Sequence, residues 1–224
     1  MEEIRMARRK GKSSEGIALC FSGGGYRAAA FHLGVMSYLH RVKLLERVEI
    51  LSTVSGGTLA GLSYAHALKK KKSFDEFYTG FKKFLSEVNL IKLCFNKLGH
   101  ESGSALGFND VITSIADVYD TRLFFGDRFD LFWQKPTIHL QEIVFNATEF
   151  RTGIDFRFQK TQNNRGIIGN GNVNIALEDA RKIRLADIAA ASSCFPGGFE
   201  PLGFPYDFRW PGGAIPQPLT DKFP

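Results

Sequence analysis

The sequence predicts an α/β fold with a mostly parallel central sheet, and three observations support this. The apolar run at 17–21 is typical of a buried parallel strand and ends at a glycine cluster. Residues 28–39 follow with strong helix formers and apolar positions spaced near 3.6 residues. The same pattern then repeats, with a strand predicted at 48–54 and a helix from 58 to about 70. Strand–helix–strand–helix with short links is a βαβ unit, which favours a layered α/β domain.

The next segment, 74–95, carries a wide apolar stripe rich in phenylalanine, with charged residues on the opposite side. It predicts one helix, or two helices with a hinge at Gly80, because an interior glycine costs a helix about 1 kcal/mol. Further elements are expected as a helix at 107–119, a strand at 137–147, a hairpin at 154–168 closing around Asn163 and Asn164, and a short helix at 183–191. Seven of the eight prolines lie between 196 and 224, so little regular structure is expected beyond Cys194.

A chain of 224 residues with 44% hydrophobic residues can bury a good core and is most simply one domain. We expect that domain to span 16–224, with a flexible basic N-terminus at 1–15 and a helical insertion or cap region at 74–136. Because the chain stops without a capped or periodic element, we expect it to be the front part of a longer polypeptide.

Composition excludes several classes of protein. No stretch reaches the roughly 18–20 apolar residues that cross a bilayer, and no apolar segment follows the charged N-terminus as in a secretory signal. The three cysteines, Cys20, Cys94 and Cys194, are odd in number and far apart. This predicts free, mostly buried thiols in a reducing compartment, no zinc or other metal site, and a cytoplasmic location.

The net charge of +6 is moderate, and its densest run is the four lysines at 69–72. Such a run is either solvated surface or a site of attraction to anionic lipid headgroups, where each basic residue contributes about 1 kcal/mol. The basic residues are otherwise dispersed and match no nucleic-acid-binding motif, so no nucleic-acid partner is expected.

Ser55 lies where the second predicted strand meets the second predicted helix, in the segment Thr53-Val54-Ser55-Gly56-Gly57. A serine becomes a good nucleophile when its geometry is fixed and a base takes its proton. The usual strand-to-helix elbow for this purpose is G-x-S-x-G, and here Thr53 replaces its first glycine. The alternative interpretation is an ordinary serine that caps the helix.

Gly23, Gly24 and Gly25 follow the first predicted strand and are joined by Arg27 at the start of the first helix. Consecutive glycines let successive N–H groups point into one concavity, which with a helix N-terminus and a nearby cation stabilises an anion. An oxyanion hole has this construction. The alternatives are a plain tight turn and a dinucleotide-binding turn, although that motif has glycine where this chain has Ala28.

Together, the order strand, Gly-Gly-Gly-x-Arg, helix, strand, x-x-Ser-x-Gly, helix resembles the patatin-like phospholipases. Two further segments extend the likeness over about 16–202. Phe145-Asn146-Ala147-Thr148 with Gly153 is similar to the family's mid-sheet strand and turn. Residues 191–196, Ala-Ser-Ser-Cys-Phe-Pro, are similar to its Ala-Ser-x-x-x-Pro block, and we interpret Ser192 and Ser193 as packing residues.

The resemblance implies a three-layer α/β/α sandwich and a lipid acyl hydrolase of the phospholipase A or lysophospholipase type that needs no cofactor or metal. Ser55 would be the nucleophile, and Gly23, Gly24, Gly25 and Arg27 would form the oxyanion hole. Thr53, Gly56 and Gly57 would shape the elbow. The partner would be a lipid substrate, with peripheral contact at a membrane surface. The Phe-rich stripe is then either an acyl-chain wall or membrane-facing cap, or simply a helix packed on the core.

The family's catalytic dyad pairs serine with an aspartate in Asp-Gly-Gly or Asp-Gly-Ala after the proline block. Here the only Gly-Gly downstream of Phe199 follows Pro211, and neither Asp207 nor Asp221 precedes a glycine. We expect the aspartate to lie beyond Pro224, with Asp207 or Asp221 as substitutes.

Several alternatives to the dyad hydrolase remain open. A Ser–Asp–His triad would use His139 with Asp127 or Asp130. An acyltransferase would use the same site on an alcohol acceptor, and a catalytically impaired lipid-binding scaffold would keep the fold without the base.

Overall fold

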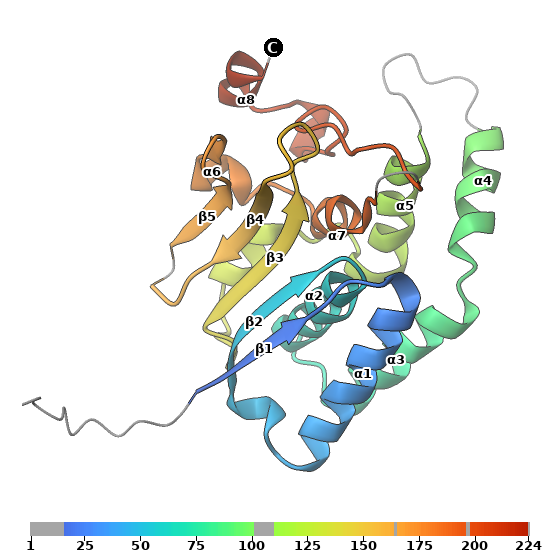
Figure 1. Cartoon of the computed structure of the whole chain (residues 1–224), viewed down its shortest axis with the longest axis vertical. Helices are drawn as coiled ribbons and strands as arrows, with labels where there is room; N and C mark the ends of the chain where they lie inside the picture. The colour runs from blue at the N-terminus through green and yellow to red at the C-terminus, as the bar shows by residue number, and fades with distance from the viewer. Residues whose placement is uncertain (1–15, 101–109, 164, 196–197, 224) are drawn as a thin grey trace, which may run out of the picture.

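The computed structural model describes residues 16–100, 110–163, 165–195 and 198–223 (Figure 1). The N-terminal segment expected to be flexible lies outside these residues. A six-stranded sheet has the order β1-β2-β3-β4-β5-β6. The strands are β1 Ile17–Phe21, β2 Val48–Val54, β3 Glu142–Thr148, β4 Asp155–Lys160, β5 Gly166–Gly169 and β6 Asn174–Ile175.

The first three strands pair in parallel, and β4, β5 and β6 continue the sheet antiparallel. The predicted α/β class is confirmed, with a mixed sheet flanked by helices. The predicted hairpin is also present as β4 and β5, although Asn164 in its turn lies outside the described residues. The third strand begins at Glu142 and not at 137 as expected, because residues 137–141 are connecting chain.

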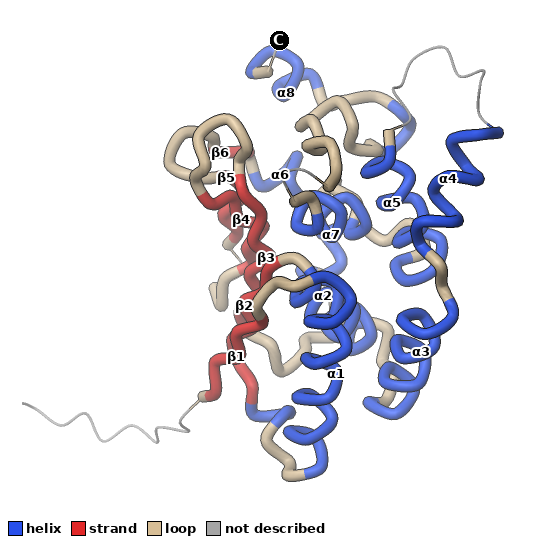
Figure 2. The backbone as a smooth tube through the Cα atoms, turned by 45° about the vertical axis from the view of Figure 1, so that its right-hand side comes forward, coloured by secondary structure: helices blue, strands red, loops and turns tan. Residues whose placement is uncertain are grey.

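The helices are α1 Gly25–Arg41, α2 Gly56–Lys69, α3 Phe74–Glu87, α4 Leu90–His100, α5 Val111–Tyr119, α6 Leu177–Ala180, α7 Leu185–Ser193 and α8 Gln217–Lys222. Short helical turns lie at Leu45–Arg47, Asp120–Phe124, Phe129–Trp133 and Pro211–Gly213. Helices α2 and α7 pack directly on the sheet, α1 packs on α2, and α5 packs on α7 (Figure 2). Helix α3 lies against α1 and α2, and α4 against α5.

A row of buried side chains crosses the sheet and explains why these strands pair in this register. Phe21 lies opposite Thr53, Thr53 opposite Phe145, and Phe145 opposite Phe158. All four are buried, and Thr53 is the polar member of the row. A one-residue slip would turn the three phenylalanines to the other face of the sheet, so the register is strongly specified.

Helix α3 is one continuous helix, so the hinge predicted at Gly80 is wrong and the break comes after Glu87. Ser73 and Glu76 form a reciprocal capping box at its start. The phenylalanine stripe faces inward, with Phe77, Phe81 and Phe84 buried against the core. This arrangement makes the stripe a packing surface, because burial of the aromatic face stabilises the helix more than the glycine weakens it.

The segment beyond Cys194 is largely irregular, as predicted, apart from Pro211–Gly213 and α8. A buried ionic network holds it in place. The carboxylate of Asp187 accepts hydrogen bonds from the Arg184 guanidinium (2.6 Å) and from the backbone N–H of Arg209 (3.1 Å). Asp117 binds both arginines, at 3.0 Å from Arg184 and 2.8 Å from Arg209. A buried charge is tolerated only when it is paired in this way.

The basic run at 69–72 is not simply solvated surface. Lys69 is 5% exposed and donates hydrogen bonds to the carbonyl oxygens of Gln134 and Pro136. Lys70 forms an ion pair with Asp127 at 2.7 Å. Lys69 therefore holds the chain between the turn Phe129–Trp133 and β3, and Lys70 contacts the chain just before that turn. Lys71 and Lys72 are exposed.

Of the three cysteines only Cys94 is buried, and the expectation of burial is wrong for Cys20, which is exposed. In the described part of the chain no helix is long and apolar enough to cross a membrane. Nor do the described His, Cys, Asp and Glu side chains form a group that could hold a metal ion.

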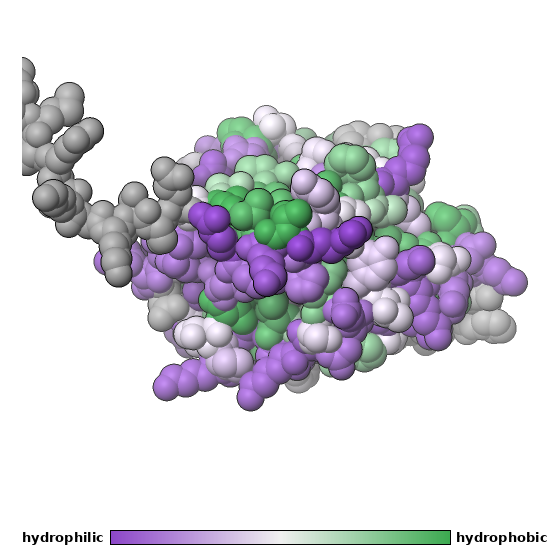
Figure 3. Space-filling model, turned by 90° about the horizontal axis from the view of Figure 1, so that it is seen from below, coloured by the Kyte–Doolittle hydropathy of each residue, from purple (hydrophilic) through white to green (hydrophobic). Residues whose placement is uncertain are grey.

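Figure 3 shows the molecule from below the view of Figure 1, at the end away from the C-terminus. This face has hydrophobic patches bordered by hydrophilic side chains.

Candidate active site

Ser55 occupies a sharp turn between β2 and α2 and has left-handed backbone angles, φ 55° and ψ −125°. A non-glycine residue in such a conformation costs about 1–3 kcal/mol, and such residues cluster at functional sites. The Ser55 side chain makes no capping hydrogen bond to the first turn of α2. The interpretation as an ordinary helix cap is therefore wrong, and the strand-to-helix elbow is the geometry found.

The glycine cluster forms the equivalent turn between β1 and α1. Gly24 and Gly25 have positive φ angles of 137° and 61°, and Gly25 begins the helix. The first amide groups of a helix have no acceptor within it, so this turn leaves N–H groups available. Gly23, Gly24 and Gly25 are exposed, as is Arg27 on the first turn of α1.

The two turns are in contact. A Cβ atom on Gly23 would lie 3.1 Å from Cβ and 3.7 Å from Oγ of Ser55. A Cβ on Gly56 would overlap the carbonyl of Gly25, and one on Gly57 would lie 2.6 Å from the carbonyl oxygen of Phe21. Glycine at these positions lets the N-terminus of α2 reach the backbone of the β1–α1 turn. The structure thus brings together the predicted nucleophile, the glycine cluster and both elbow glycines.

A side chain far along the chain holds the elbow in place. The backbone N–H of Ser55 donates to Oγ of Ser192 at 2.8 Å, and the Ser192 hydroxyl donates to the carbonyl oxygen of Asn146 at 2.6 Å. The Asn146 amide in turn donates to the carbonyl oxygen of Thr53 at 2.9 Å. Ser192 is buried, so its hydroxyl connects α7, β3 and the Ser55 turn in one network. Interpreting it as a packing residue missed this polar role.

Thr53 fits the elbow although it replaces the usual glycine. Its hydroxyl is 2.9 Å from that of Thr58, which is 2.9 Å from Oγ of Ser192. Its methyl group lies over Gly61, where a Cβ would come within 2.6 Å of it. Gly61 in α2 therefore leaves the room that Thr53 in β2 needs. A glycine inside a predicted helix was the signal of this contact in the sequence.

The other predicted turn is also anchored by a helix side chain. His32 on α1 makes a 2.9 Å hydrogen bond from Nε2 to the carbonyl oxygen of Ser22, and its ring stacks on Phe21 at 4.3 Å. His32 therefore fixes the end of β1 directly before Gly23. Both turns depend on contacts that local sequence patterns do not reveal.

The two substitute carboxylates have other partners. Asp207 accepts a hydrogen bond from the N–H of Gly203 at 2.5 Å, and Asp221 accepts one from the Gln217 amide at 2.8 Å. Burial raises the pKa of Asp207, and the Gly203 N–H opposes this effect. Neither contact joins these carboxylates to Ser55.

The residues of the triad alternative are separated. Asp127 binds His66 at 2.7 Å and Lys70 at 2.7 Å, while Asp130 accepts a hydrogen bond from Gln134. His139 instead contacts the hydroxyl of Tyr64 at 3.3 Å. Burial lowers the pKa of His66, against the opposing effect of Asp127. His66 lies on α2 eleven residues after Ser55, about 16 Å along the helix from it. None of these contacts builds a triad on Ser55.

A largely apolar cavity of about 370 Å³ lies beside the network, between the ends of β3 and α7 and the C-terminal segment. Most of its lining residues are apolar or aromatic: Ala147, Phe150, Phe156, Phe158, Val173, Ala191, Phe195, Phe199, Pro201, Leu202, Phe204, Phe208 and Phe223. Ala147 follows Asn146 and Ala191 precedes Ser192, so the cavity adjoins the residues that hold the Ser55 turn. Pro196 of the family-like block lies outside the described residues.

The comparisons with known proteins agree with this geometry. A search of the curated proteins finds no match. A family model described as Patatin-like phospholipase matches residues 19–215, which is most of the chain and contains both turns and the cavity-lining segments up to Phe208. The chain therefore belongs to the patatin-like phospholipases, a family of lipid acyl hydrolases.

Proposed function

We propose that the chain cleaves ester bonds of phospholipids or related lipids through an acyl-enzyme on Ser55. The observation that carries this proposal is the contact between the two turns. It places Ser55, which has a strained backbone and makes no capping hydrogen bond to α2, beside Gly23. The family membership supports a lipid substrate, and so does the apolar cavity beside the network.

In the proposed reaction a carboxylate takes the proton of the Ser55 hydroxyl while Oγ attacks the ester carbonyl carbon. The carbonyl oxygen becomes an anion, stabilised by N–H groups of Gly23–Gly25 and by the positive charge of Arg27. Collapse of this intermediate breaks the ester bond, and the departing alcohol takes up the proton. Water then attacks the acyl-enzyme with the same carboxylate as base, releasing the fatty acid and restoring the serine.

We further propose that the base belongs to an Asp-Gly-Gly or Asp-Gly-Ala motif outside residues 1–224. No aspartate of the chain is followed by glycine, and Asp207 and Asp221 are engaged with Gly203 and Gln217. Asp207→Asn and Asp221→Asn test the substitutes. In a protein extended past Pro224, retained activity in both variants supports the proposal, whereas a loss of activity in only one variant would make that aspartate the base.

A fluorophosphonate probe tests the nucleophile directly, because it reacts only with an activated hydroxyl. Because the proposed base lies outside residues 1–224, the protein tested extends past Pro224. We expect this protein to be labelled, Ser55→Ala to lose labelling, and the control Ser86→Ala, which removes an exposed serine of α3, to label fully. The adduct should map to Ser55 by mass spectrometry. An adduct on any other residue contradicts the proposal. A protein extended past Pro224 that stays unlabelled favours the non-catalytic scaffold.

Product analysis separates the finer alternatives. Incubation with phosphatidylcholine or lysophosphatidylcholine should release free fatty acid. Release from the diacyl substrate indicates phospholipase A activity, and release from the monoacyl substrate alone indicates lysophospholipase activity. Acyl esters formed with added glycerol in place of free fatty acid would show acyl transfer by the same serine.

A further inference from the structure

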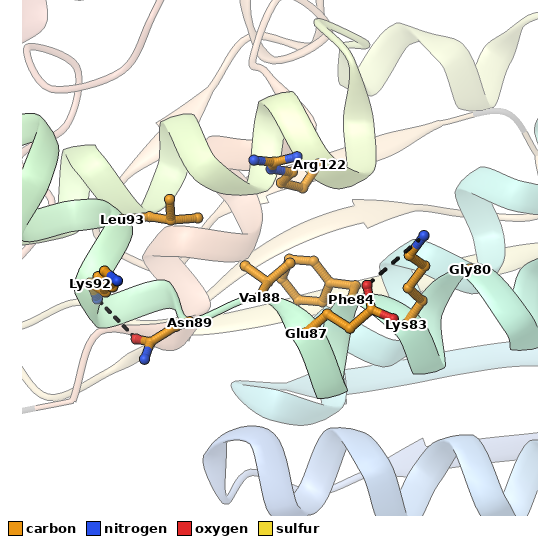
Figure 4. Close-up of a pocket in the computed structure, with 9 residues that line it drawn as sticks. All are labelled: Gly80, Lys83, Phe84, Glu87, Val88, Asn89, Lys92, Leu93 and Arg122. Atoms are coloured by element: carbon orange, nitrogen blue, oxygen red, sulfur yellow. Dashed lines mark hydrogen bonds and ion pairs between the residues drawn. The ribbon is translucent and has the colours of Figure 1, made fainter.

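A second cavity, of about 550 Å³, lies between α3, α4 and the turn Asp120–Phe124 (Figure 4). Its lining residues are Gly80, Lys83, Phe84, Glu87, Val88, Asn89, Lys92, Leu93 and Arg122. Phe84 is buried, and Val88 and Leu93 are half-buried and packed against the core. The inner wall of this cavity, which we call the α3–α4 cavity, is therefore apolar.

The rim of the α3–α4 cavity is cationic. Lys83, Lys92 and Arg122 are all exposed, and Glu87 is the single carboxylate among the lining residues. Glu87 lies 3.9 Å from Lys83, with both side chains mostly exposed, so their attraction is weak. Among the described residues, no carboxylate is within ion-pair distance of Lys92 or Arg122. The cavity thus carries an excess of positive charge next to apolar surface.

Gly80 keeps one wall of the cavity open. It lies in the interior of α3, where glycine is unfavourable, and a Cβ there would meet nothing within 4 Å. A side chain at this position would strengthen the helix and occupy space at the cavity. The glycine is therefore not required by packing, and its effect is to leave room beside Lys83 and Phe84.

Helix α4 presents large apolar side chains to solvent beside this cavity. Ile91 is 50% exposed and Phe95 is 62% exposed, and they lie four residues apart on one side of the helix. Cys94, on the other side, is buried against the core. A helix that combines exposed bulky apolar residues with basic residues such as Lys92 is typical of a membrane interface.

We propose that the α3–α4 cavity binds the headgroup of an anionic phospholipid at a bilayer surface. Lys83, Lys92 and Arg122 bind the phosphate oxygens through charge-assisted hydrogen bonds, and Ile91 and Phe95 contact the hydrocarbon. This binding does not require Ser55 to be a nucleophile. The ring of Phe84 also lies 6.0 Å from that of Tyr26, the residue after Gly25. A protein docked in this way therefore holds its β1–α1 turn close to the lipid.

Vesicle co-sedimentation tests the proposal, with Ser55→Ala as the background in order to prevent lipid turnover. The vesicles are phosphatidylcholine alone, or phosphatidylcholine mixed with phosphatidylglycerol. Each basic residue near an anionic surface contributes about a fivefold gain in binding. We expect Lys83→Gln/Lys92→Gln/Arg122→Gln to weaken binding to the mixed vesicles at least about tenfold. Gly80→Leu should weaken it while every charge is kept.

A matched control separates the cavity from net charge. Lys43→Gln/Lys71→Gln/Lys72→Gln removes the same number of exposed cations outside the cavity, and its binding should change by less than about fivefold. Ile91→Ser/Phe95→Ser should weaken binding even at high salt. The proposal is overturned if the two triple variants lose binding equally. It is also overturned if the cavity variants bind like the background protein while circular dichroism shows that they are folded.

Discussion

The β1–α1 turn and the β2–α2 turn both link a parallel strand to the helix that follows it, but they place different residues at positive φ angles. Both end a parallel strand, begin a helix and contain positive φ angles. The first uses Gly24 and Gly25, which adopt such angles at little cost. The second places Ser55 there, at a cost in strain that buried hydrogen bonds from α7 and β3 offset. The difference shows that glycines relieve the strain of the first turn, whereas the second turn keeps a side chain at a positive φ angle and needs hydrogen bonds from distant elements.

The largest effect should come from breaking the contact between the two turns. In Gly56→Ala the new methyl group overlaps the carbonyl of Gly25, so α2 or the glycine turn must move. We expect the free energy of unfolding to fall by about 3 kcal/mol or more, measured by urea denaturation. The control Gly80→Ala meets no atom within 4 Å and should gain about 1 kcal/mol. Equal stability of Gly56→Ala and the unmodified protein would show that the turns do not pack as described.

Narrowing the space between the turns should affect reactivity more than stability. In Gly23→Ala the methyl group lies 3.1 Å from Cβ of Ser55, which requires a shift of a few tenths of an ångström. We expect the rate of fluorophosphonate labelling to fall by about 100-fold, as when one oxyanion donor is lost. Gly34→Ala, in an open position of α1, is the control and should label normally. Unchanged labelling of Gly23→Ala would remove Gly23 from the site.

Loosening the support of the Ser55 turn should lower both stability and reactivity. Ser192→Ala leaves the Ser55 N–H and the Asn146 carbonyl without their partner, which costs about 1–3 kcal/mol in thermal or urea unfolding. The adjacent variant Ser193→Ala removes bonds to the carbonyl oxygen of Ala189 and to the side chain of Tyr119 but none to the Ser55 turn, so it should leave the rate of fluorophosphonate labelling unchanged. If the two variants behave alike, Ser192 does not support the elbow.

The smallest effect should come from relieving the strain itself. Ser55→Gly and Ser55→Ala both remove the hydroxyl, but only glycine adopts φ 55° without steric cost. We expect Ser55→Gly to be more stable than Ser55→Ala by about 1 kcal/mol, measured as a difference in unfolding midpoint between two inactive proteins. A more stable alanine variant would contradict the strain.

Local patterns predicted the βαβ unit well because strands and helices there obey simple periodicities. β2 begins and ends as predicted, and α2 differs by only one or two residues at each end. The adjacency of Ser55 and Gly23 also followed from topology, since neighbouring parallel strands end at the same edge. The hinge predicted at Gly80 is absent because burial of Phe77, Phe81 and Phe84 stabilises α3 more than the low helix propensity of one glycine weakens it.

What the sequence could not predict was the long-range support of the site. Nothing near Ser192 indicates that its hydroxyl binds the N–H of a residue 137 positions earlier. The fit of Thr53 against Gly61 likewise joins a strand to a helix and has no local signature. Lys69 belongs to a run that is typical of surface, yet its ammonium group is buried against two backbone carbonyls. Such contacts depend on three-dimensional packing and become visible only with the structure.

The separation between Ser55 and Ser192 also has a consequence for the newly made protein. A ribosome adding about 5–20 residues per second needs roughly ten seconds to travel from codon 55 to codon 192. Throughout that interval the emerging polypeptide lacks the hydroxyl that binds the backbone N–H of Ser55. The order of synthesis therefore leaves the Ser55 turn without this support until α7 has been made, and a nascent fragment ending before α7 should not hold the turn in its native geometry.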